Sequence, residues 1–416
     1  MNLDTELAAV QSANRKLIQL DEENVNAILH ALADAAEAPE HVQTILEANK
    51  KDLARMETND PKYDRLKLTE ERLRTIANDI RNVAQLPFPL NIILEERDLP
   101  SGLHLQKTTV PIGVIGVIYE ARPNVTFDVF ALCFKSGNAC VLKGGSDAKD
   151  SNAAITYLIH TVLQKHGIDT KVCYLAPPER EAVEAILNAD KYIDLVIPRG
   201  SQNLINFVRE HAKMPTIETG AGIVHIYVDE GADTIMARDI IENSKVKRPS
   251  VCNAVDCILM NKMKIPDIRE ICAPLAKHKV IIHADIMSHQ ALKGYYPDEL
   301  LLPATDEDFG HEWLSLQMTI KTVSNIDEAI EHVTTYSSKH SEAIVSNNQK
   351  NIERYLREID AAAVYANAST YFTDGAQFGL GAEIGISTQK MHARGPMGLR
   401  ELTSYKWILR GSGQVR

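Results

Sequence analysis

Cys252 lies in the segment KRPSVCNAVDC (residues 247–257), and its neighbours are of the types that activate a thiol. Lys245, Lys247 and Arg248 stand just upstream, and the run that follows could open a helix. Positive charge and a helix N-terminus both favour the thiolate, which is the nucleophilic form of cysteine. The alternative is a small buried apolar residue, the commonest fate of a cysteine. The local pattern makes Cys252 a candidate nucleophile and leaves that alternative open.

A turn with an amide side chain follows the apolar run VIGVIYEA. It reads Arg122-Pro123-Asn124, and parallel α/β sheets build their sites at the carboxyl ends of such strands. The Asn124 amide could donate a hydrogen bond to an oxyanion. It could equally cap a helix or stabilise the turn.

Two more turns after apolar runs could contact a nucleotide. One contains Lys143, Gly145 and Ser146, and the other contains Gly200 and Ser201 at the expected start of a helix. Glycine permits close approach of the backbone, and lysine and serine reach hydroxyl or phosphate groups. Amides at a helix start can receive a phosphate. Neither turn is a GxGxxG or P-loop motif, so each signal is weak by itself.

Two acids and a glycine-rich segment complete the candidate chemistry. Glu218 lies in the turn IETGAG, and Glu312 lies in GHEWLSL. Glu218 could instead be a solvated turn carboxylate, and Glu312 could be an acid on an amphipathic helix. The segment 378–399 carries five glycines together with His392 and Arg394. Such a density of glycine predicts backbone close to a ligand, or alternatively an exposed loop.

The elements that must position these residues alternate along the chain. Residues 1–85 show the three-and-four apolar spacing of helices. A hairpin is predicted around Pro100–Gly102, and from residue 114 onward apolar strands and amphipathic helices follow one another. This order predicts an α/β fold with doubly wound parallel sheets. The tail SYKWILRGSGQVR reads as a lone strand, which must pair with the hairpin or with a partner subunit.

The composition excludes several functional classes. The 416 residues include 45 basic and 56 acidic ones, giving a formal charge of −11 and arguing against a nucleic-acid partner. The N-terminus lacks the order of a signal peptide, and no run approaches the ~18 apolar residues of a membrane span. Six scattered cysteines suggest reduced thiols in a cytoplasmic enzyme. Because no CxxC or HExxH motif occurs, we expect no metal site.

Taken together, these motifs resemble the aldehyde dehydrogenase superfamily. The order matches: PIGVIGVI followed by Asn124, then VLKGGS, RGS, IETGAG, a cysteine 34 residues after Glu218, EW and a glycine-rich tail. The stretches IYEARPNVT, AIEHVTTYSSKHSEAIV and HARGPMGLRELTSYKW resemble the glutamate-5-semialdehyde dehydrogenase branch. The resemblance runs from about residue 5 to the end, and it favours Cys252 as the nucleophile.

The resemblance implies a reaction. In this branch L-glutamyl 5-phosphate and NADPH give L-glutamate 5-semialdehyde, NADP and phosphate, the second step of proline synthesis from glutamate. Cys252 would displace phosphate and form a thioester, which hydride from NADPH would reduce. Asn124 and the backbone N–H of Cys252 would bind the oxyanion.

The resemblance also implies roles for the remaining candidates. Lys143 and Glu312 correspond to family residues that hold the two riboses of the cofactor. Glu218 stands where hydrolytic members carry a water-activating base, which a reductase does not need. The expected cofactor residues are Lys143, Gly145, Ser146, Gly200, Ser201, Glu218 and Glu312. The cationic candidates for the anionic groups of the substrate are Arg122, Lys247, Arg248, His392 and Arg394.

The resemblance further implies three parts and a homo-oligomer. Residues 1–94 and 114–222 would bind NADP(H), and residues 223–395 would form the catalytic domain. Residues 95–113 and 396–416 would form a small β element for oligomerisation into a dimer or a dimer of dimers. Glutamate 5-kinase, which makes the labile acyl phosphate, is a candidate partner on which the sequence is silent.

Two rival functions remain at this stage. One is an oxidising, hydrolytic aldehyde dehydrogenase, which would form acids without phosphate. The other is a scaffold or regulator that keeps the fold without activity. Phosphate dependence of the oxidative direction and selective labelling of Cys252 by iodoacetamide would discriminate among them.

Overall fold

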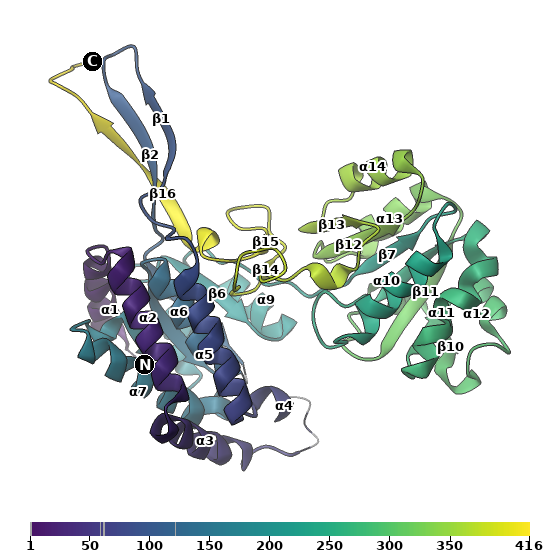
Figure 1. Cartoon of the computed structure of the whole chain (residues 1–416), viewed down its shortest axis with the longest axis horizontal. Coiled ribbons are helices and arrows are strands. Elements are labelled where there is room, and N and C mark those ends of the chain that lie inside the picture. Colours follow the sequence, from purple (N-terminus) through teal and green to yellow (C-terminus); the bar gives the residue numbers. More distant parts are fainter. Residues whose placement is uncertain (1, 59, 61–62, 121) are drawn as a thin grey trace. The chain divides into compact units, whose positions relative to one another are not determined.

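The structure of the chain, a computed structural model, describes residues 2–58, 60, 63–120 and 122–416. The chain divides into two compact units, whose elements are labelled in Figure 1. Unit 1 comprises residues 1–219, 379–385 and 396–416, and unit 2 comprises residues 220–378 and 386–395. Within the described ranges, no helix is long and apolar enough to cross a membrane.

Unit 1 begins with helices, as the apolar spacing predicts. Two of them start at capping side chains: Asp21 accepts a hydrogen bond from the amide of Asn24, and Thr69 accepts one from the amide of Arg72. Their apolar faces are buried, and α2 packs along α5. The helices are α1 (Asp4–Leu17), α2 (Glu22–Glu37), α3 (Pro39–Leu53), α4 (Tyr63–Leu66) and α5 (Glu70–Gln85).

A four-stranded parallel sheet in the order β5-β4-β3-β6 forms the core of unit 1. Its strands are β3 (Val114–Tyr119), β4 (Ala139–Gly144), β5 (Cys173–Leu175) and β6 (Leu195–Arg199). The helices that alternate with them are α6 (Asn124–Lys135), α7 (Lys149–Lys165), α8 (Glu181–Leu187) and α9 (Gln202–His211). Because β4 and β6 flank β3, the strand order reverses there, and open α/β sheets bind ligands at the carboxyl ends beside such a switch point.

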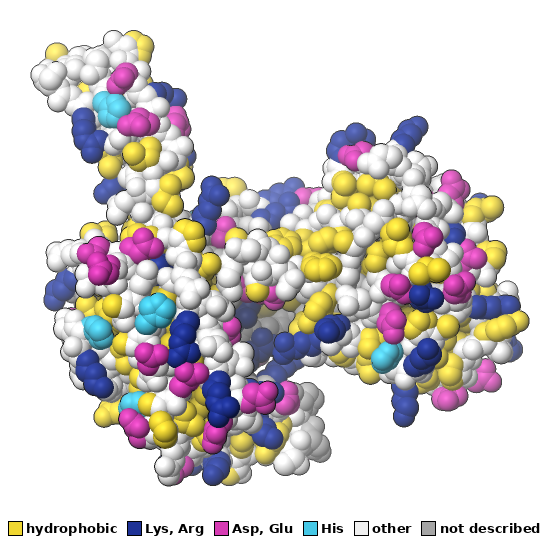
Figure 2. Space-filling view, viewed as in Figure 1, with side chains coloured by type: hydrophobic (Ala, Val, Ile, Leu, Met, Phe, Trp, Pro, Cys, Tyr) yellow, Lys and Arg dark blue, Asp and Glu magenta, His cyan; other side chains and the backbone are white. Residues whose placement is uncertain are grey.

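A separate antiparallel sheet of three strands lies within unit 1. It consists of β1 (Ile93–Asp98), β2 (His104–Pro111) and β16 (Thr403–Arg410), with β2 in the centre. The pairing of β16 with β2 confirms that the tail strand joins the hairpin. Figure 2 shows hydrophobic side chains along this sheet at the upper left. Its exposed large apolar residues are Ile93, Leu94, Tyr405, Trp407 and Leu409.

Unit 2 contains a parallel sheet of seven strands in the order β10-β9-β11-β8-β7-β12-β13. The strands are β7 (His225–Val228), β8 (Cys257–Asn261), β9 (Ile281–Ala284), β10 (Leu301–Pro303), β11 (Gln317–Val323), β12 (Ser341–Val345) and β13 (Ala363–Ala366). The helices are α10 (Thr234–Val246), α11 (Ile268–Lys277), α12 (Ile286–Leu292), α13 (Ile326–Tyr336) and α14 (Gln349–Glu358). Short strands β14 (Ile386–Ser387) and β15 (Gly395–Pro396) follow.

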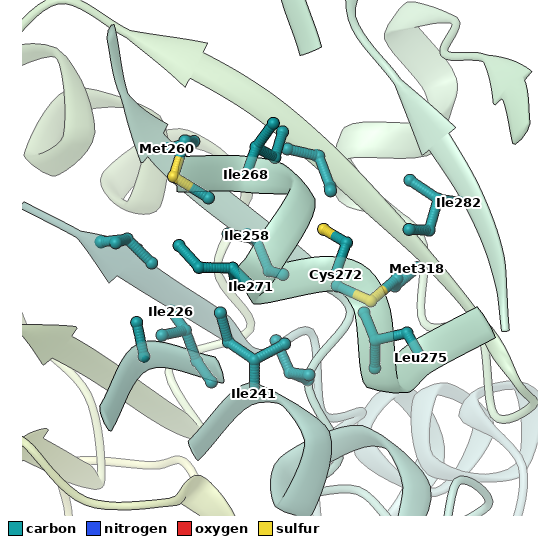
Figure 3. Packing of buried hydrophobic residues seen from close by; sticks show 14 of the residues in the cluster. Ile226, Ile241, Ile258, Met260, Ile268, Ile271, Cys272, Leu275, Ile282 and Met318 are labelled. Atoms are coloured by element: carbon teal, nitrogen blue, oxygen red, sulfur yellow. The ribbon is translucent and has the colours of Figure 1, made fainter. Parts of the chain in front are cut away.

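Each face of this sheet has its own apolar core. On one face, Ile258 of β8 packs with Ile241 of α10 and Ile271 of α11 (Figure 3). On the other face, Leu259 of β8 packs with Val333 of α13. Successive strand residues point to opposite faces, so a strand buried on both sides is mostly apolar along its length. The structure thereby confirms the predicted α/β class with parallel sheets.

Candidate active site

Cys252 lies in the loop between α10 and β8, and its side chain is partly exposed. The other five cysteines are buried, and none of the six, all of which are described, forms a disulfide. The expectation that a helix begins just after Cys252 is wrong: residues 252–254 form a turn that leads into β8. The apolar residues that follow enter β8, so no helix begins directly after this thiol.

A close backbone contact fixes the cysteine loop. A Cβ atom added to Gly222 would lie 1.6 Å from the carbonyl oxygen of Cys252 and 2.7 Å from its Cα. The amide of Gly222 in turn donates a hydrogen bond of 2.7 Å to Oε1 of Glu312. Glycine is required because any side chain would displace one of the two segments. Glu312, which the sequence assigned to the cofactor, thus holds the backbone of Gly222, and this backbone packs against Cys252.

Hydrogen bonds from Asn253 tie the same loop to the segment at 370–373. Its Nδ2 donates to the carbonyl oxygens of Tyr371 (3.2 Å) and Thr373 (2.9 Å), and its own carbonyl accepts from Oγ1 of Thr370 at 2.8 Å. These bonds are buried or part-buried, where breaking one is costly. The backbone on the C-terminal side of Cys252 is therefore fixed independently of any ligand.

The three cations upstream of Cys252 differ in their surroundings. Lys247 and Arg248 are exposed. Lys245 is fully buried, and its Nζ donates to the carbonyl of Val255 at 2.8 Å and lies 3.8 Å from Oδ1 of Asp256. Burial lowers the pKa of Lys245 and raises the pKa of Asp256, while their mutual attraction opposes both shifts. This buried pair stabilises the start of β8.

Asn124 is the first residue of α6, and a carboxyl group one turn later orients it. Its Nδ2 donates a hydrogen bond of 3.0 Å to Oδ2 of Asp128. Burial raises the pKa of Asp128 to about 7, although this hydrogen bond acts to lower it. An amide has two N–H donors, so one of them remains for another acceptor. Arg122, in the preceding turn, is exposed.

The turn after β4 places its lysine deep in unit 1. Lys143 is 5% exposed, and its Nζ donates to the carbonyls of Gly144 (2.9 Å) and Pro178 (3.2 Å). Burial lowers its pKa. Gly145 is partly exposed and has an extended backbone, and Ser146 is exposed at the start of a short 3-10 helix. The Gly145 backbone and the Ser146 hydroxyl therefore lie at the surface, and the Lys143 side chain is buried beneath them.

The turn before α9 is different, because a carboxylate already lies there. Ser201 donates its amide to Oε2 of Glu120 (2.9 Å) and its hydroxyl to Oε1 (3.1 Å). A Cβ on Gly200 would lie 2.7 Å from Oε2 of the same glutamate. An anionic group therefore does bind the start of α9, as the helix amides and dipole favour. That group is the carboxylate of Glu120, a residue of the protein itself. A phosphate would have to displace Glu120.

The remaining candidates are held by charged neighbours. Glu218 in unit 1 forms an ion pair with Arg209 at 3.5 Å. In unit 2, Nη2 of Arg394 lies 2.8 Å from Oδ1 of Asp360. His392 is exposed and has a φ of 64°, an uncommon conformation for a residue other than glycine. Arg394 is therefore an ion-paired residue.

Each unit thus gathers a subset of the predicted residues. In unit 1, Asn124, Ser146 and Ser201 follow the carboxyl ends of strands of one parallel sheet, and Lys143 is the next-to-last residue of β4. In unit 2, Cys252 and Glu312 are linked through Gly222. Sequence reasoning missed Gly222, Asp128 and Glu120 as supporting residues. The spacing of four between Asn124 and Asp128 could have suggested their contact, whereas Glu120 meets Ser201 only through the fold.

A model of the aldehyde dehydrogenase family matches residues 20–284. This chain belongs to the aldehyde dehydrogenase family, and a nicotinamide cofactor and a small-molecule substrate go with that membership. It is 60% identical over 410 residues to a gamma-glutamyl phosphate reductase of Chlorobaculum parvum, covering 99% of this chain and 97% of that protein. It is 58% identical to the enzyme of the same name from Bacteroides thetaiotaomicron, covering 100% and 99%.

Solved structures agree with this membership. The crystal structure of gamma-glutamyl phosphate reductase from Thermotoga maritima matches with a TM-score of 0.94 and 39% identity, over 100% of both chains. An acetylating aldehyde dehydrogenase from Geobacillus thermoglucosidasius matches with a TM-score of 0.70 and 16% identity, over 100% of this chain and 97% of that one. The second likeness concerns the fold alone.

Proposed function

We propose that this protein reduces L-glutamyl 5-phosphate to L-glutamate 5-semialdehyde and phosphate with NADPH, the second step of proline synthesis from glutamate. The observation that carries the proposal is the partly exposed Cys252 on a rigidly held loop. The substrate and the direction come from relatives that are 58–60% identical along essentially the whole chain.

The reaction proposed at Cys252 needs no reactants other than the acyl phosphate and the reduced cofactor. Its thiolate attacks the acyl carbon, the bond from that carbon to the phosphate oxygen breaks, and phosphate leaves with the electron pair. The product is a thioester on Cys252. A reduced nicotinamide cofactor, when bound, would supply hydride to the thioester carbonyl. The carbon–sulfur bond of the resulting thiohemiacetal anion then breaks, releasing the aldehyde and restoring the thiolate.

Both tetrahedral species carry an oxyanion that needs hydrogen-bond donors. We assign one donor to the amide N–H of Asn124 that is not bonded to Asp128, and another to the backbone N–H of Cys252. Removing one oxyanion donor typically lowers kcat by about 100- to 1000-fold. Asn124→Ala should therefore lose kcat while thiol labelling of Cys252 continues at the rate of the unmodified protein.

Cofactor binding is assigned to unit 1, and nucleophilic chemistry to unit 2. The turn after β4 fits a dinucleotide, because Gly145 and Ser146 present backbone and hydroxyl at the carboxyl edge of the sheet beside the switch strand β3. Lys143 and Ser146 are the proposed contacts to the adenosine ribose and its 2′-phosphate, which would favour NADP. The turn with Gly200 and Ser201 fits less well, because Glu120 lies there.

Other residues keep the roles that the sequence suggested, as proposals. Glu312 is assigned to the nicotinamide ribose, and its hydrogen bond with the Gly222 amide shows that its carboxylate already holds the cysteine loop. Glu218 is assigned to the cofactor and has no role as a base. The cationic candidates for the substrate are Arg122, Lys247, Arg248, His392 and Arg394. Of these, Arg394 would have to give up or share Asp360.

The three-stranded sheet is proposed as the contact between subunits of a homo-oligomer. Both outer strands, β1 and β16, have open edges, and Trp407 and Leu409 expose apolar surface there. Replacing both residues with Asp should lower the molar mass in sedimentation equilibrium toward that of one chain. An unchanged molar mass would remove the proposal. A further proposed partner is glutamate 5-kinase, which co-purification with the purified kinase would test.

The deciding assay follows NADP reduction by glutamate semialdehyde with and without inorganic phosphate. Wild type should require phosphate, Cys252→Ala should be inactive, and Cys272→Ala, which alters a buried cysteine of the same unit, should be active. Turnover without phosphate would instead indicate a hydrolytic aldehyde dehydrogenase. Full activity of Cys252→Ala would refute the assignment of the nucleophile.

A further inference from the structure

Three side chains with metal-binding atoms meet on the face of the unit 2 sheet that α13 covers. His225 is the first residue of β7 and pairs in register with Cys257, the first residue of β8. His332 reaches them from α13. One ligand atom of each residue lies within 4.8 Å of those of the other two, and all three residues are buried. We propose that His225, Cys257 and His332 form a binding site for a zinc-like divalent cation.

One separation between the ligand atoms suits a cation of that class. Sγ of Cys257 lies 3.9 Å from Nε2 of His332. A sulfur at 2.3 Å and a nitrogen at about 2.0–2.1 Å from one tetrahedral zinc are themselves about 3.6 Å apart. The observed separation exceeds this value by a few tenths of an ångström, within reach of small side-chain rotations. Cysteine and histidine are also the ligands that zinc prefers.

The protonation of His225 leaves one ring nitrogen available for a ligand role. Its Nδ1 lies 3.2 Å from Oε2 of Glu342, which pairs in register with it on β12. Donation to this carboxylate puts the proton on Nδ1 and leaves a lone pair on Nε2. Among the described residues, Nε2 of His225 has no hydrogen-bond partner although it is buried. A carboxylate that orients a metal-binding histidine in this way is a recurrent arrangement.

A buried polar nitrogen without a partner destabilises the fold unless something satisfies it. The surroundings offer little else, because Phe309 and Tyr336 contact the His332 ring. A cation would satisfy both imidazoles at once.

Two negative charges would lie beside the cation. Coordination deprotonates a thiol, so Cys257 would contribute one, and Glu342 contributes another. Lys321 adds a positive charge nearby. The site lies on the sheet face opposite Cys272 and its apolar cluster. A structural role at the start of three strands follows, because β8, β7 and β12 all begin there.

The test is refolding with metal, since a buried site fills most readily as the chain folds. Full-length protein carrying Cys252→Ala, so that this thiol supplies no ligand, is unfolded with chelator, refolded with CoCl2 or ZnCl2 and desalted. The expected result is one metal per chain, a thiolate-to-cobalt charge-transfer band in the near ultraviolet, and a higher Tm with zinc. Adding Cys257→Ala or His332→Phe should abolish the band and the Tm shift, whereas adding Cys272→Ala should keep both.

Two results would contradict the proposed cation site. Refolded protein without stoichiometric metal overturns the proposal. Metal bound with no charge-transfer band, or with a band that survives Cys257→Ala, places the ion elsewhere and overturns it equally. If Cys257→Ala does not refold, His332→Phe decides the question alone. None of these readouts uses enzymatic activity, so the outcome is independent of the proposed reaction.

Discussion

The contact between Gly222 and the cysteine loop makes a quantitative prediction. A Cβ at residue 222 would lie 1.6 Å from the carbonyl oxygen of Cys252, whereas ordinary contact begins near 3.4 Å. In Gly222→Ala the two segments must therefore separate by about 1.8 Å, the difference of these distances. Because a 1 Å misplacement of a reacting group can cost about 100-fold in rate, kcat/KM should fall by about 100-fold or more.

The assay compares two alanine variants of the same unit. In Gly231→Ala the new Cβ would have only the amide nitrogen of Asn348 near it, at 4.0 Å. That variant should keep wild-type kcat/KM and the wild-type rate of iodoacetamide labelling at Cys252. Gly222→Ala should lose activity and change its labelling rate while its circular dichroism spectrum is retained. If Gly222→Ala had wild-type kinetics and labelling, the loop would not be positioned by this contact and the reasoning would fail.

Two further predictions concern unit 1. Because burial raises the pKa of Asp128 to about 7, from the ordinary aspartate value of about 4, wild type should lose stability relative to Asp128→Asn as the pH rises from about 4 to about 7. Urea unfolding at pH 5 and pH 8 measures this difference, and an equal difference at both values would contradict it. Asn138 donates from Nδ2 to the carbonyl of Leu402 (2.8 Å) and accepts from the amide of Gly113 (2.8 Å). Asn138→Ala should cost about 1–3 kcal/mol, because it leaves buried groups unsatisfied, and limited proteolysis should then cleave near residue 402 first; wild-type Tm and cleavage pattern would refute this.

Local patterns predicted the elements well where a single physical cause dominates. The helices of residues 1–85 follow from apolar spacing and caps such as Asp21 and Thr69. Buried strands such as β3 and β4 follow from continuous apolar runs. The helix expected after Cys252 does not form, because the apolar run that continues from Val255 leads into strand β8. Tertiary burial, rather than local preference, decided that segment.

For the candidate site, the sequence predicted the chemical groups but not the contacts that they make. Residue types identified Cys252, Asn124 and Lys143 as chemical groups, but their partners depend on positions distant in sequence. The buried Lys245 illustrates this limit: its charge is close to Cys252 in the chain, yet its Nζ is bonded to the carbonyl of Val255 and paired with Asp256. Proximity along the chain therefore did not reveal the partners of Lys245.

The proposed cation site is a second case in which interacting residues lie far apart in the sequence. Metal motifs are recognised in sequences when ligands lie a few residues apart on one element. His225, Cys257 and His332 are separated by 32 and 75 residues, which no such motif covers. They meet because parallel strands β7 and β8 start in register and α13 crosses above them. Register is set by the packing of the whole sheet, so a site that depends on it can be inferred only once the fold is in hand.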